Sequence, residues 1–539
     1  MYFSVNTSYK EHMNSIRVLD VTLRDGGCVN NFNFGHIYMD KILSALEKGR
    51  LDIIEVGYID EKKGSEKGRT QYINEKVIYN NFLTDKKGET EYVAMIDYPK
   101  FDVDKLEIKH SKGIDGIRIA FHKKDRLNVV PFCKTILDKG YHLYIQPMTI
   151  MRYTDSELLE FIEIVNKELG DASAFYIVDS FGEMRMNDMQ RVLNLVDHNL
   201  KKDMTIGFHS HNNLQLSYSN AVSMLQFPMN RDIIIDASLV GMGKGAGNLN
   251  TELFLEHLNL YYKKNYQLAP LLEVIDNVIN QVKEEFHWGY SVEYYLSSAN
   301  HCTPSYASYF YNKHMLKIDQ VAELLSEIAE EKKISFDEKY AEELYREYNI
   351  KNFDDTDTVE EIKQIFKNKK ICLIAPGKSI EKYKSEIERY LDDPEYICIS
   401  MNILNLEKVN YVLISRQEVS DLAQNVSSRL LVTSNIVYNG KAKVDILDYK
   451  KWISVIEGET YDSAGFIILN LLEQCDVKEV IMAGFDGYKS DITENYFDIT
   501  FRRPVTSSQA QKRNEVYKKW LDSKQALNIK FITPSLYME

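Results

Sequence analysis

The sequence lacks three features that would each indicate a particular class of protein. It has no basic stripe: 66 lysines and arginines face 80 aspartates and glutamates, for a net charge of -14, which argues against nucleic acid as a partner. Its six cysteines form no CxxC pair, so neither a disulfide framework nor a thiolate zinc site is indicated. No apolar run reaches the roughly 18 residues that span a bilayer, and no signal peptide is apparent at the start. Together these absences predict a soluble, cytoplasmic protein without membrane insertion.

The amino-terminal half also lacks the glycine-rich dinucleotide loop that follows the first strand of many open α/β sheets. Eight short, apolar, β-branched runs alternate there with amphipathic segments. The runs are IRVLDV, LDIIEV, EYVAMI, GIRIAF, YHLYIQ, AFYIVD, MTIGFH and DIIIDAS. Eight such units over this length predict a (β/α)₈ TIM barrel, with a doubly wound open sheet as the alternative.

A chain of 539 residues is too long for one core, because single cores rarely exceed roughly 250–300 residues. We expect the barrel over residues 15–268 and a helical connector or lid over 269–368, where apolar residues recur at three- and four-residue spacing. A second βα series begins at KKICLIAPGKS and includes YICIS, NYVLIS, KEVIMAGFDGY and IKFITPS. It predicts a smaller, Rossmann-like three-layer α/β domain over residues 369–539.

Three polar sets follow predicted barrel strands, where functional side chains converge. LDVTLRDGGC places Arg24 and Asp25 after the first strand, GFHSHNN places His209 and His211 at the seventh, and the loop GMGKGAGN presents Asn248 after the eighth. Each set has a plain structural alternative: a surface turn, two histidines on a half-buried strand, or a phosphate cradle. Their coincidence on one barrel favours a site.

One carboxylate and two imidazoles form a facial set of ligands that leaves positions open for substrate, as a catalytic metal site requires. A divalent cation there would polarise a carbonyl group. The neighbouring Arg24 could stabilise the oxyanion that develops on enolisation.

These motifs resemble those of the DRE-TIM metallolyases, the HMGL-like superfamily, over about residues 15–300. VDSFGEM and GKGAGN are most similar to the 4-hydroxy-2-oxovalerate aldolase branch, and in particular to aldolase-domain proteins of bacterial surface-polysaccharide gene clusters. The resemblance implies a metal-dependent lyase or aldolase that makes or cleaves a C–C bond next to a 2-oxo acid such as pyruvate. The reaction would pass through a metal-bound enolate and serve surface-polysaccharide precursor synthesis.

By the same resemblance, Arg24 contacts the oxo oxygen of the substrate and Ser180 contacts its carboxylate. The metal is expected to be Mn²⁺ or Mg²⁺, or else Co²⁺ or Zn²⁺. Its implied ligands are Asp25, His209 and His211, with Asn248 as a further ligand or a residue just behind the ligands.

The chain departs from the hydroxy-oxo-acid aldolases at one position, because Cys28 stands where they carry a histidine. A thiol could shuttle a proton there or simply line the pocket. Replacement acid/base candidates are Tyr290, Tyr294 and His301, which could equally pack a helix onto the barrel mouth. Further candidates for the pocket lining, from predicted strand ends, are His122, Gln146, Glu55 and Asp97.

In the carboxyl-terminal half, KICLIAPGKSIEKYK predicts a strand, a glycine turn and a helix. Gly377, Lys378 and Ser379 could bind a phosphate there or only turn the chain and cap the helix, because the Walker spacing is absent. IMAGFDGY is weakly similar to nucleotide-sugar domains, and the pair Arg502 and Arg503 could add phosphate contacts. The predicted partner of this domain is a nucleotide or nucleotide-sugar.

Two alternatives to the aldolase remain open. A Claisen-type enzyme on the same barrel would condense or cleave an acyl-CoA. A non-catalytic binding protein is favoured by the loss of histidine at Cys28 and opposed by the retention of every predicted metal ligand. A homo-oligomer is the default expectation for a soluble enzyme.

Overall fold

The computed structural model describes residues 15–62, 66–82, 88–110, 112–313, 316–350, 352–498 and 507–538. The chain divides into two compact units, Met1–Ala307 and Ser308–Glu539. This division falls inside the segment 269–368 that we predicted as a connector. Among the described helices, none combines the length and the apolar character needed to cross a membrane.

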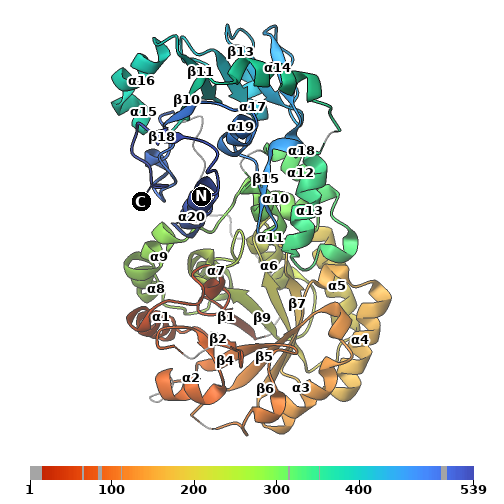
Figure 1. The fold of residues 1–539 in the computed structure, drawn as a ribbon. Helices are drawn as coiled ribbons and strands as arrows, with labels where there is room; N and C mark the ends of the chain where they lie inside the picture. Colours follow the sequence, from red (N-terminus) through yellow and green to blue (C-terminus); the bar gives the residue numbers. More distant parts are fainter. Residues whose placement is uncertain are drawn as a thin grey trace, which may run out of the picture. The chain divides into compact units, whose positions relative to one another are not determined.

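The first unit contains a closed barrel of eight parallel strands, as predicted (Figure 1). The pairing of β1 with both β2 and β9 closes the sheet. A two-residue strand, β3 (Gln71–Tyr72), adds to β2 outside the ring. The barrel strands are β1 (Ile16–Asp20), β2 (Ile53–Ile59), β4 (Glu91–Asp97), β5 (Gly116–Phe121), β6 (His142–Pro147), β7 (Ala174–Asp179), β8 (Thr205–Ser210) and β9 (Ile233–Ala237).

Helices surround these strands, as Figure 1 shows for the orange and yellow part of the chain. In the described part of the β4–β5 connection, the only helical element is a 3-10 turn, η2 (Val103–Lys105). The helices of the barrel are α1 (His36–Lys48), α2 (Glu75–Phe82), α3 (Val129–Asp138), α4 (Asp155–Glu168), α5 (Met186–Asn199), α6 (Ser217–Gln226) and α7 (Thr251–Tyr262).

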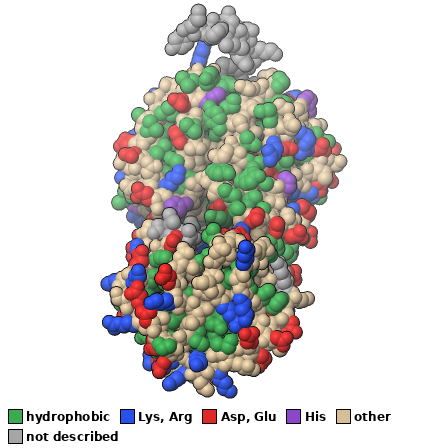
Figure 2. All heavy atoms as spheres, turned by 90° about the horizontal axis from the view of Figure 1, so that it is seen from above, with side chains coloured by type: hydrophobic (Ala, Val, Ile, Leu, Met, Phe, Trp, Pro, Cys, Tyr) green, Lys and Arg blue, Asp and Glu red, His purple; other side chains and the backbone are tan. Residues whose placement is uncertain are grey.

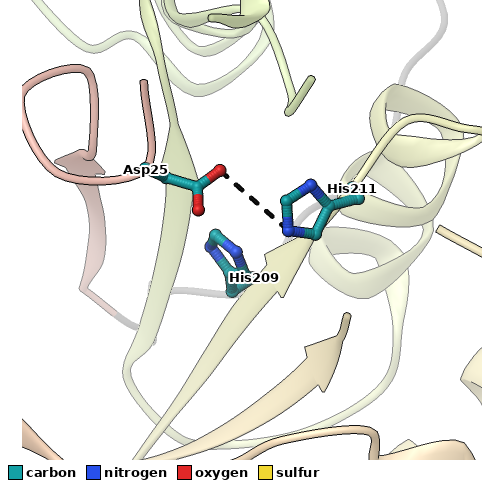
Figure 3. Close-up of side chains that lie close together, drawn as sticks. All are labelled: Asp25, His209 and His211. Atoms are coloured by element: carbon teal, nitrogen blue, oxygen red, sulfur yellow. Dashed lines mark ion pairs between the residues drawn. The ribbon is translucent and has the colours of Figure 1, made fainter. Parts of the chain in front are cut away.

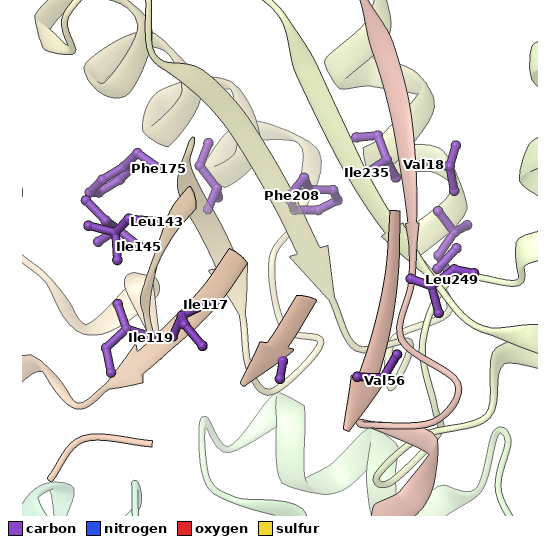
Figure 4. Close-up of a cluster of buried hydrophobic side chains, with 14 of the residues drawn as sticks. Val18, Val56, Ile117, Ile119, Leu143, Ile145, Phe175, Phe208, Ile235 and Leu249 are labelled. Carbon is purple, nitrogen blue, oxygen red and sulfur yellow. The ribbon is translucent and has the colours of Figure 1, made fainter. Parts of the chain in front are cut away.

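Side chains alternate along each strand between the helix-facing core and the barrel interior. Figure 4 shows part of the helix-facing core, including Val18, Ile117 and Phe208. The interior positions between them form a separate apolar cluster that includes Leu19 and Ile234. The same alternation directs charged residues nearer the carboxyl ends of the strands into the interior.

After α7 the chain continues through helices that complete the first unit. Buried apolar side chains of this segment, among them Leu271, Val278 and Trp288, belong to the barrel core. The indole Nε1 of Trp288 donates to the carbonyl of Val240 at 3.0 Å. The helices are α8 (Leu268–Val274), the π-helical η6 (Ile275–Ile279), α9 (Asn280–Glu285), α10 (Val292–Ala299) and the first half of α11 (Pro304–Tyr311).

The second unit contains a seven-stranded parallel sheet in the order β14-β13-β12-β11-β10-β17-β18, which confirms a second α/β domain. Five of its strands match predicted runs: β10 (Lys370–Ile374), β11 (Tyr396–Met401), β12 (Tyr411–Ile414), β17 (Glu479–Ala483) and β18 (Ile529–Phe531). The sequence prediction missed β13 (Arg429–Thr433), β14 (Val444–Leu447) and the hairpin of β15 (Ser454–Ile456) and β16 (Glu459–Tyr461).

Two hydrophobic clusters lie on opposite faces of this sheet, which gives it three layers. Ile371 and Leu373 of β10 belong to one cluster, and Cys372 and Ile374 belong to the other. The helices of this unit are α12 (Ile318–Ser326), α13 (Glu338–Asn349), α14 (Thr356–Phe366), α15 (Ser379–Lys382), α16 (Lys384–Leu391), α17 (Gln417–Leu422), α18 (Tyr449–Trp452), α19 (Ala464–Glu473) and α20 (Ser507–Asp522).

Candidate metal centre

Asp25, His209 and His211 meet at the carboxyl-terminal end of the barrel, where they point toward one another (Figure 3). One ligand atom from each residue lies within 4.8 Å of the others, and His211 Nε2 is 4.0 Å from Asp25 Oδ2. Asp25 follows β1 by a few residues, and the two histidines lie at the end of β8 and just beyond it. Residues far apart in the sequence thus form one candidate metal site.

Hydrogen bonds fix both imidazoles through their Nδ1 atoms. His209 Nδ1 is 2.9 Å from Asp236 Oδ2, and His211 Nδ1 is 3.1 Å from the carbonyl oxygen of Lys244. An Nδ1–H that donates to an oxygen leaves Nε2 with its lone pair, which is the arrangement typical of a metal-ligating histidine.

Asn248 lies directly against the carboxylate of Asp25. Its Nδ2 donates to Asp25 Oδ2 at 2.7 Å and to the carbonyl of Met242 at 3.1 Å. Its Oδ1 is buried and has no hydrogen-bond partner among the described residues. An unpaired amide oxygen beside a carboxylate and two imidazoles suits an oxygen-binding cation, so the residues present fit a divalent metal.

Glycine at position 243 allows the loop after β9 to approach this site closely. A Cβ atom built on Gly243 would lie 2.4 Å from Asn248 Nδ2 and 2.7 Å from Asp25 Oδ2. Any side chain there would therefore displace the carboxylate or the amide.

The charge state of the site also suits a cation. Burial favours the neutral form of Asp25, but Arg24 and the two histidines outweigh it and hold the pKa of Asp25 well below its ordinary value. Burial lowers the pKa of His211 to about 4. At neutral pH the set thus offers one carboxylate and a neutral His211 ring as ligands.

A network of buried ions lies beneath the site, inside the barrel. Arg24 Nε donates to Glu55 Oε2 at 2.7 Å, and Arg24 Nη1 donates to Asp25 Oδ1 at 2.8 Å. Arg118, which is fully buried, donates to the same Glu55 oxygen at 2.8 Å and also to Asp236. This network joins Arg24 to the carboxylate that orients His209.

The sequence prediction missed Arg118 and Asp236. A signal for both existed, since each is a lone charge within an apolar strand, in GIRIAF and DIIIDAS, and a charge buried there needs a partner. The predicted Gln146 is buried beside Arg118. With its carbonyl oxygen toward the guanidinium, it accepts from Nη2 at 3.1 Å and from Nε at 3.3 Å.

Cys28 lies three residues after Asp25, in the 3-10 turn η1 (Gly26–Cys28). The residue reaches solvent, yet enough protein surrounds the thiol that its burial raises the pKa to about 12. A thiol that stays protonated at neutral pH is a poor proton shuttle, which favours the pocket-lining interpretation.

A second polar group lies at the ends of β6 and β7. Ser180 Oγ accepts a hydrogen bond from the Thr149 amide at 2.8 Å, which leaves its hydroxyl proton available to a ligand. His301 Nδ1 is 2.6 Å from Glu183 Oε2, and the same carboxylate accepts from Arg152 Nη2 at 2.7 Å. Arg152 Nη2 also donates to the His301 carbonyl at 3.1 Å.

The remaining barrel candidates lie in different surroundings. Tyr290, just before α10, is 60% exposed, and Tyr294 is half-buried within α10. His122 is half-buried, and its Nδ1 has no hydrogen-bond partner among the described residues. Asp97 pairs with Lys100.

In the second unit, the residues predicted to bind phosphate already have internal partners. Asp486 accepts from the amide of Ser379 at 2.7 Å and from its hydroxyl. Lys378 Nζ donates to the carbonyl of Thr493 at 2.9 Å and lies 3.3 Å from Glu494. The carboxylate of Asp486 thus occupies the helix end where a phosphate was expected. Arg502 and Arg503 lie outside the described residues.

Comparisons with known proteins agree with the geometry of the barrel. The HMGL-like family model matches residues 118–278. The 4-hydroxy-2-oxovalerate aldolase of Pseudoalteromonas translucida is 26% identical over 273 residues, covering 49% of this chain and 76% of that protein. That of Geobacillus genomosp. 3 is 29% identical over 278 residues, covering 50% and 78%.

Among solved structures, the N-terminal domain of a protein described as a candidate aldolase, from Bacteroides vulgatus, is 26% identical with a TM-score of 0.49. It aligns with 55% of this chain and 97% of its own. The family match and these sequence relatives support the assignment of the barrel to the DRE-TIM metallolyases, the HMGL-like family of lyases and aldolases.

Proposed function

We propose that the barrel is a divalent-metal-dependent aldolase that makes or cleaves a C–C bond next to a 2-oxo acid such as pyruvate. The observation that carries the proposal is the orientation of the two imidazoles: Asp236 and the Lys244 carbonyl hold their Nδ1 atoms and leave Nε2 beside Asp25. A cation bound there would polarise the substrate carbonyl and favour loss of the adjacent proton.

Arg24 is suited to hold the substrate oxygen. Its Nε and Nη1 atoms are engaged by Glu55 and Asp25, and we assign Nη2 as the donor to the oxygen on which negative charge develops. Because the guanidinium is fixed by two carboxylates before substrate arrives, it needs little reorganisation as that charge forms.

Proton transfer requires a different group from Cys28, whose thiol stays protonated. We assign this role to His301, because Glu183 orients its ring through Nδ1 and leaves Nε2 to accept or donate a proton. Ser180 would donate a hydrogen bond from its hydroxyl to the substrate carboxylate. Tyr290 and Tyr294 remain the alternatives for proton transfer.

The proposal is tested by the exchange of pyruvate methyl protons into deuterated water, followed by NMR. Exchange should require added Mn²⁺ or Mg²⁺, cease with a chelator, and fall by about 100-fold or more in His209→Ala, since even residues behind a ligand are worth 10–100-fold. His198→Ala, which removes an exposed histidine on α5, is the matched control and should exchange normally.

A protein that binds the metal but exchanges no pyruvate proton would contradict the proposal. CoA release from an acyl-CoA would then indicate the Claisen-type reaction, and absence of both would indicate a binding protein. The finer assignments are also part of the proposal. The family resemblance supports Mn²⁺ or Mg²⁺ and surface-polysaccharide precursor synthesis, the scattered cysteines support a cytoplasmic location, and a homo-oligomer is the default for a soluble enzyme.

A further inference from the structure

The second unit contains a cavity of about 380 Å³, within the size range of small-ligand sites. It lies at the carboxyl ends of β10 and β17, where Gly377 and Gly484 form part of its lining. These neighbouring strands are the point at which the strand order reverses: β11 to β14 extend to one side of β10, and β17 and β18 to the other. Parallel α/β sheets bind ligands at this crevice.

The amino terminus of α19 opens into the same cavity. Residues 462–466, which include the N-cap Ser463, form part of the lining, and Ser463 makes no side-chain capping bond. The first turn of α19 contains no acidic residue, in contrast to α15, whose amino terminus Asp486 occupies. Amide groups and the helix dipole at such an end attract an anion.

Two side chains of α20 that line the cavity, Arg513 and Tyr517, each have a buried donor atom without a hydrogen-bond partner among the described residues. Tyr517 is only 5% exposed, yet its hydroxyl has no hydrogen-bond partner among the described residues. A Cβ atom built on Gly465 would lie 2.1 Å from that hydroxyl oxygen, so the hydroxyl abuts the first turn of α19. Arg513, one helical turn earlier, has a buried Nη1 that is likewise without a partner in the described part of the chain.

Most acidic groups of the lining already have partners within the unit. Glu459 pairs with Lys512, Asp462 accepts from the hydroxyls of Tyr345 and Tyr449, and Asp486 accepts from Ser379. Burial raises the pKa of Tyr517 well above its ordinary value, so its hydroxyl remains a donor. The unpaired donors thus leave this end of the cavity suited to a negative charge.

Aromatic side chains supply the remaining wall. Tyr461, Tyr488 and Tyr496 all line the cavity, and the guanidinium of Arg513 lies 5.3 Å from the ring centre of Tyr488. Tyrosine rings stack on nucleobases with little preference for the base.

We propose that this cavity binds a nucleoside diphosphate, with its phosphates at the amino terminus of α19 against Arg513 and Tyr517 and its base on the tyrosine wall. The site is separate from the barrel centre and does not depend on the aldolase activity. Gly377 lines this cavity, but we assign the phosphates to α19 and not to the site predicted from sequence at Gly377, Lys378 and Ser379.

Isothermal titration of the full-length protein with UDP, CDP, GDP and ADP tests the site, with inorganic pyrophosphate and the four nucleosides as further ligands. At least one diphosphate should bind more tightly than both pyrophosphate and its own nucleoside. Arg513→Gln should weaken it about tenfold or more, because a charge-assisted bond is lost. Tyr517→Phe, which keeps the ring, should weaken it severalfold.

Two control variants should leave the affinity unchanged: Arg389→Gln, which replaces an exposed residue of α16, and Lys378→Gln. Circular dichroism should show that all four variants are folded. The proposal is overturned if none of the four diphosphates binds, or if binding survives both α20 substitutions undiminished. Pyrophosphate binding as tightly as the best diphosphate would overturn the assignment of a nucleoside.

Discussion

Asp236 illustrates how one buried side chain serves both stability and the metal centre. It accepts from Arg118 and lies 2.9 Å from His209 Nδ1. Burial alone would favour its neutral form, but Arg118 and His209 hold the pKa of Asp236 below its ordinary value. Its negative charge therefore balances the buried guanidinium, and its carboxylate orients the ring of His209.

Asp236→Asn should reduce Mn²⁺ affinity about 10–100-fold, because the amide keeps the shape of the side chain but loses the charge behind His209. Isothermal titration measures this change. Asp197→Asn is the matched control, since Asp197 also forms a buried pair, with Arg231, outside the metal centre. Equal loss of affinity in both variants would mean that Asp236 acts only through general stability.

Asp20, also buried at the end of β1, should make the stability of the barrel depend on pH. Burial raises its pKa from 3.8 to about 6, against the opposing effect of hydrogen bonds from Thr22 and Thr251. As pH rises, the carboxyl group of Asp20 loses its proton at a lower pH in the unfolded chain than in the folded protein. The free energy of unfolding of the wild type should therefore fall between about pH 4 and pH 6, by up to about 3 kcal/mol.

Asp20→Asn should remove that fall. Denaturant unfolding of both proteins across this range measures the difference, with the exposed Asp203→Asn as the control for loss of a carboxylate. A constant difference between wild type and Asp20→Asn at all pH values would contradict the assignment.

At the level of elements, the glycine-rich loop after β9 determines whether the ligands can assemble. His211 and Asn248 form an isolated antiparallel bridge, and the amide of Asn212 donates to the carbonyl of Gly247 at 2.8 Å. The loop therefore holds Asn248 beside the histidines by backbone hydrogen bonds, while Gly243 lets it pass close to Asp25.

Gly243→Ala should weaken metal binding about tenfold or more, because its methyl group would overlap Asn248 and Asp25. Displacing metal ligands should lower the metal affinity at least as much as removing a residue that supports them. Gly113→Ala, where the new Cβ would lie 3.6 Å from its nearest neighbour, is the control. Unchanged Mn²⁺ affinity in Gly243→Ala would mean that the loop can move away without cost.

The strands show which elements can be predicted from the sequence pattern alone. All eight barrel strands were predicted, because strands buried on both faces appear as continuous apolar runs. β14 (VDIL) and the three-residue strands β15 and β16 were missed. Such short segments, each of which contains a polar residue, resemble loops, and only pairing with a neighbour makes them strands.

For the whole molecule, the division at residues 307 and 308 predicts that the first unit folds alone. A fragment of residues 1–307 should bind Mn²⁺ within about threefold of the full-length protein. A fragment ending at residue 268 should unfold or lose much of its stability, since it removes Leu271, Val278 and Trp288 from the core. Each buried apolar side chain of this kind is worth about 1.5–3 kcal/mol.

Thermal unfolding and titration of both fragments check this prediction. Equal stability of the two would favour a barrel that ends at residue 268.

On the face of the molecule in Figure 2, lysine and arginine side chains of the described residues are interspersed with aspartate and glutamate, so solubility should not prevent either comparison.

The sequence by itself determined the barrel, the second α/β domain, and the residues Asp25, His209 and His211, because alternating apolar runs and short motifs are local features. Tertiary structure alone decided the pairing of Arg118 with Glu55 and Asp236, the partner of His301, and the cavity beside α19. These depend on contacts between residues far apart in the chain. A buried charge reveals that it needs a partner, but only the folded chain determines which one it finds.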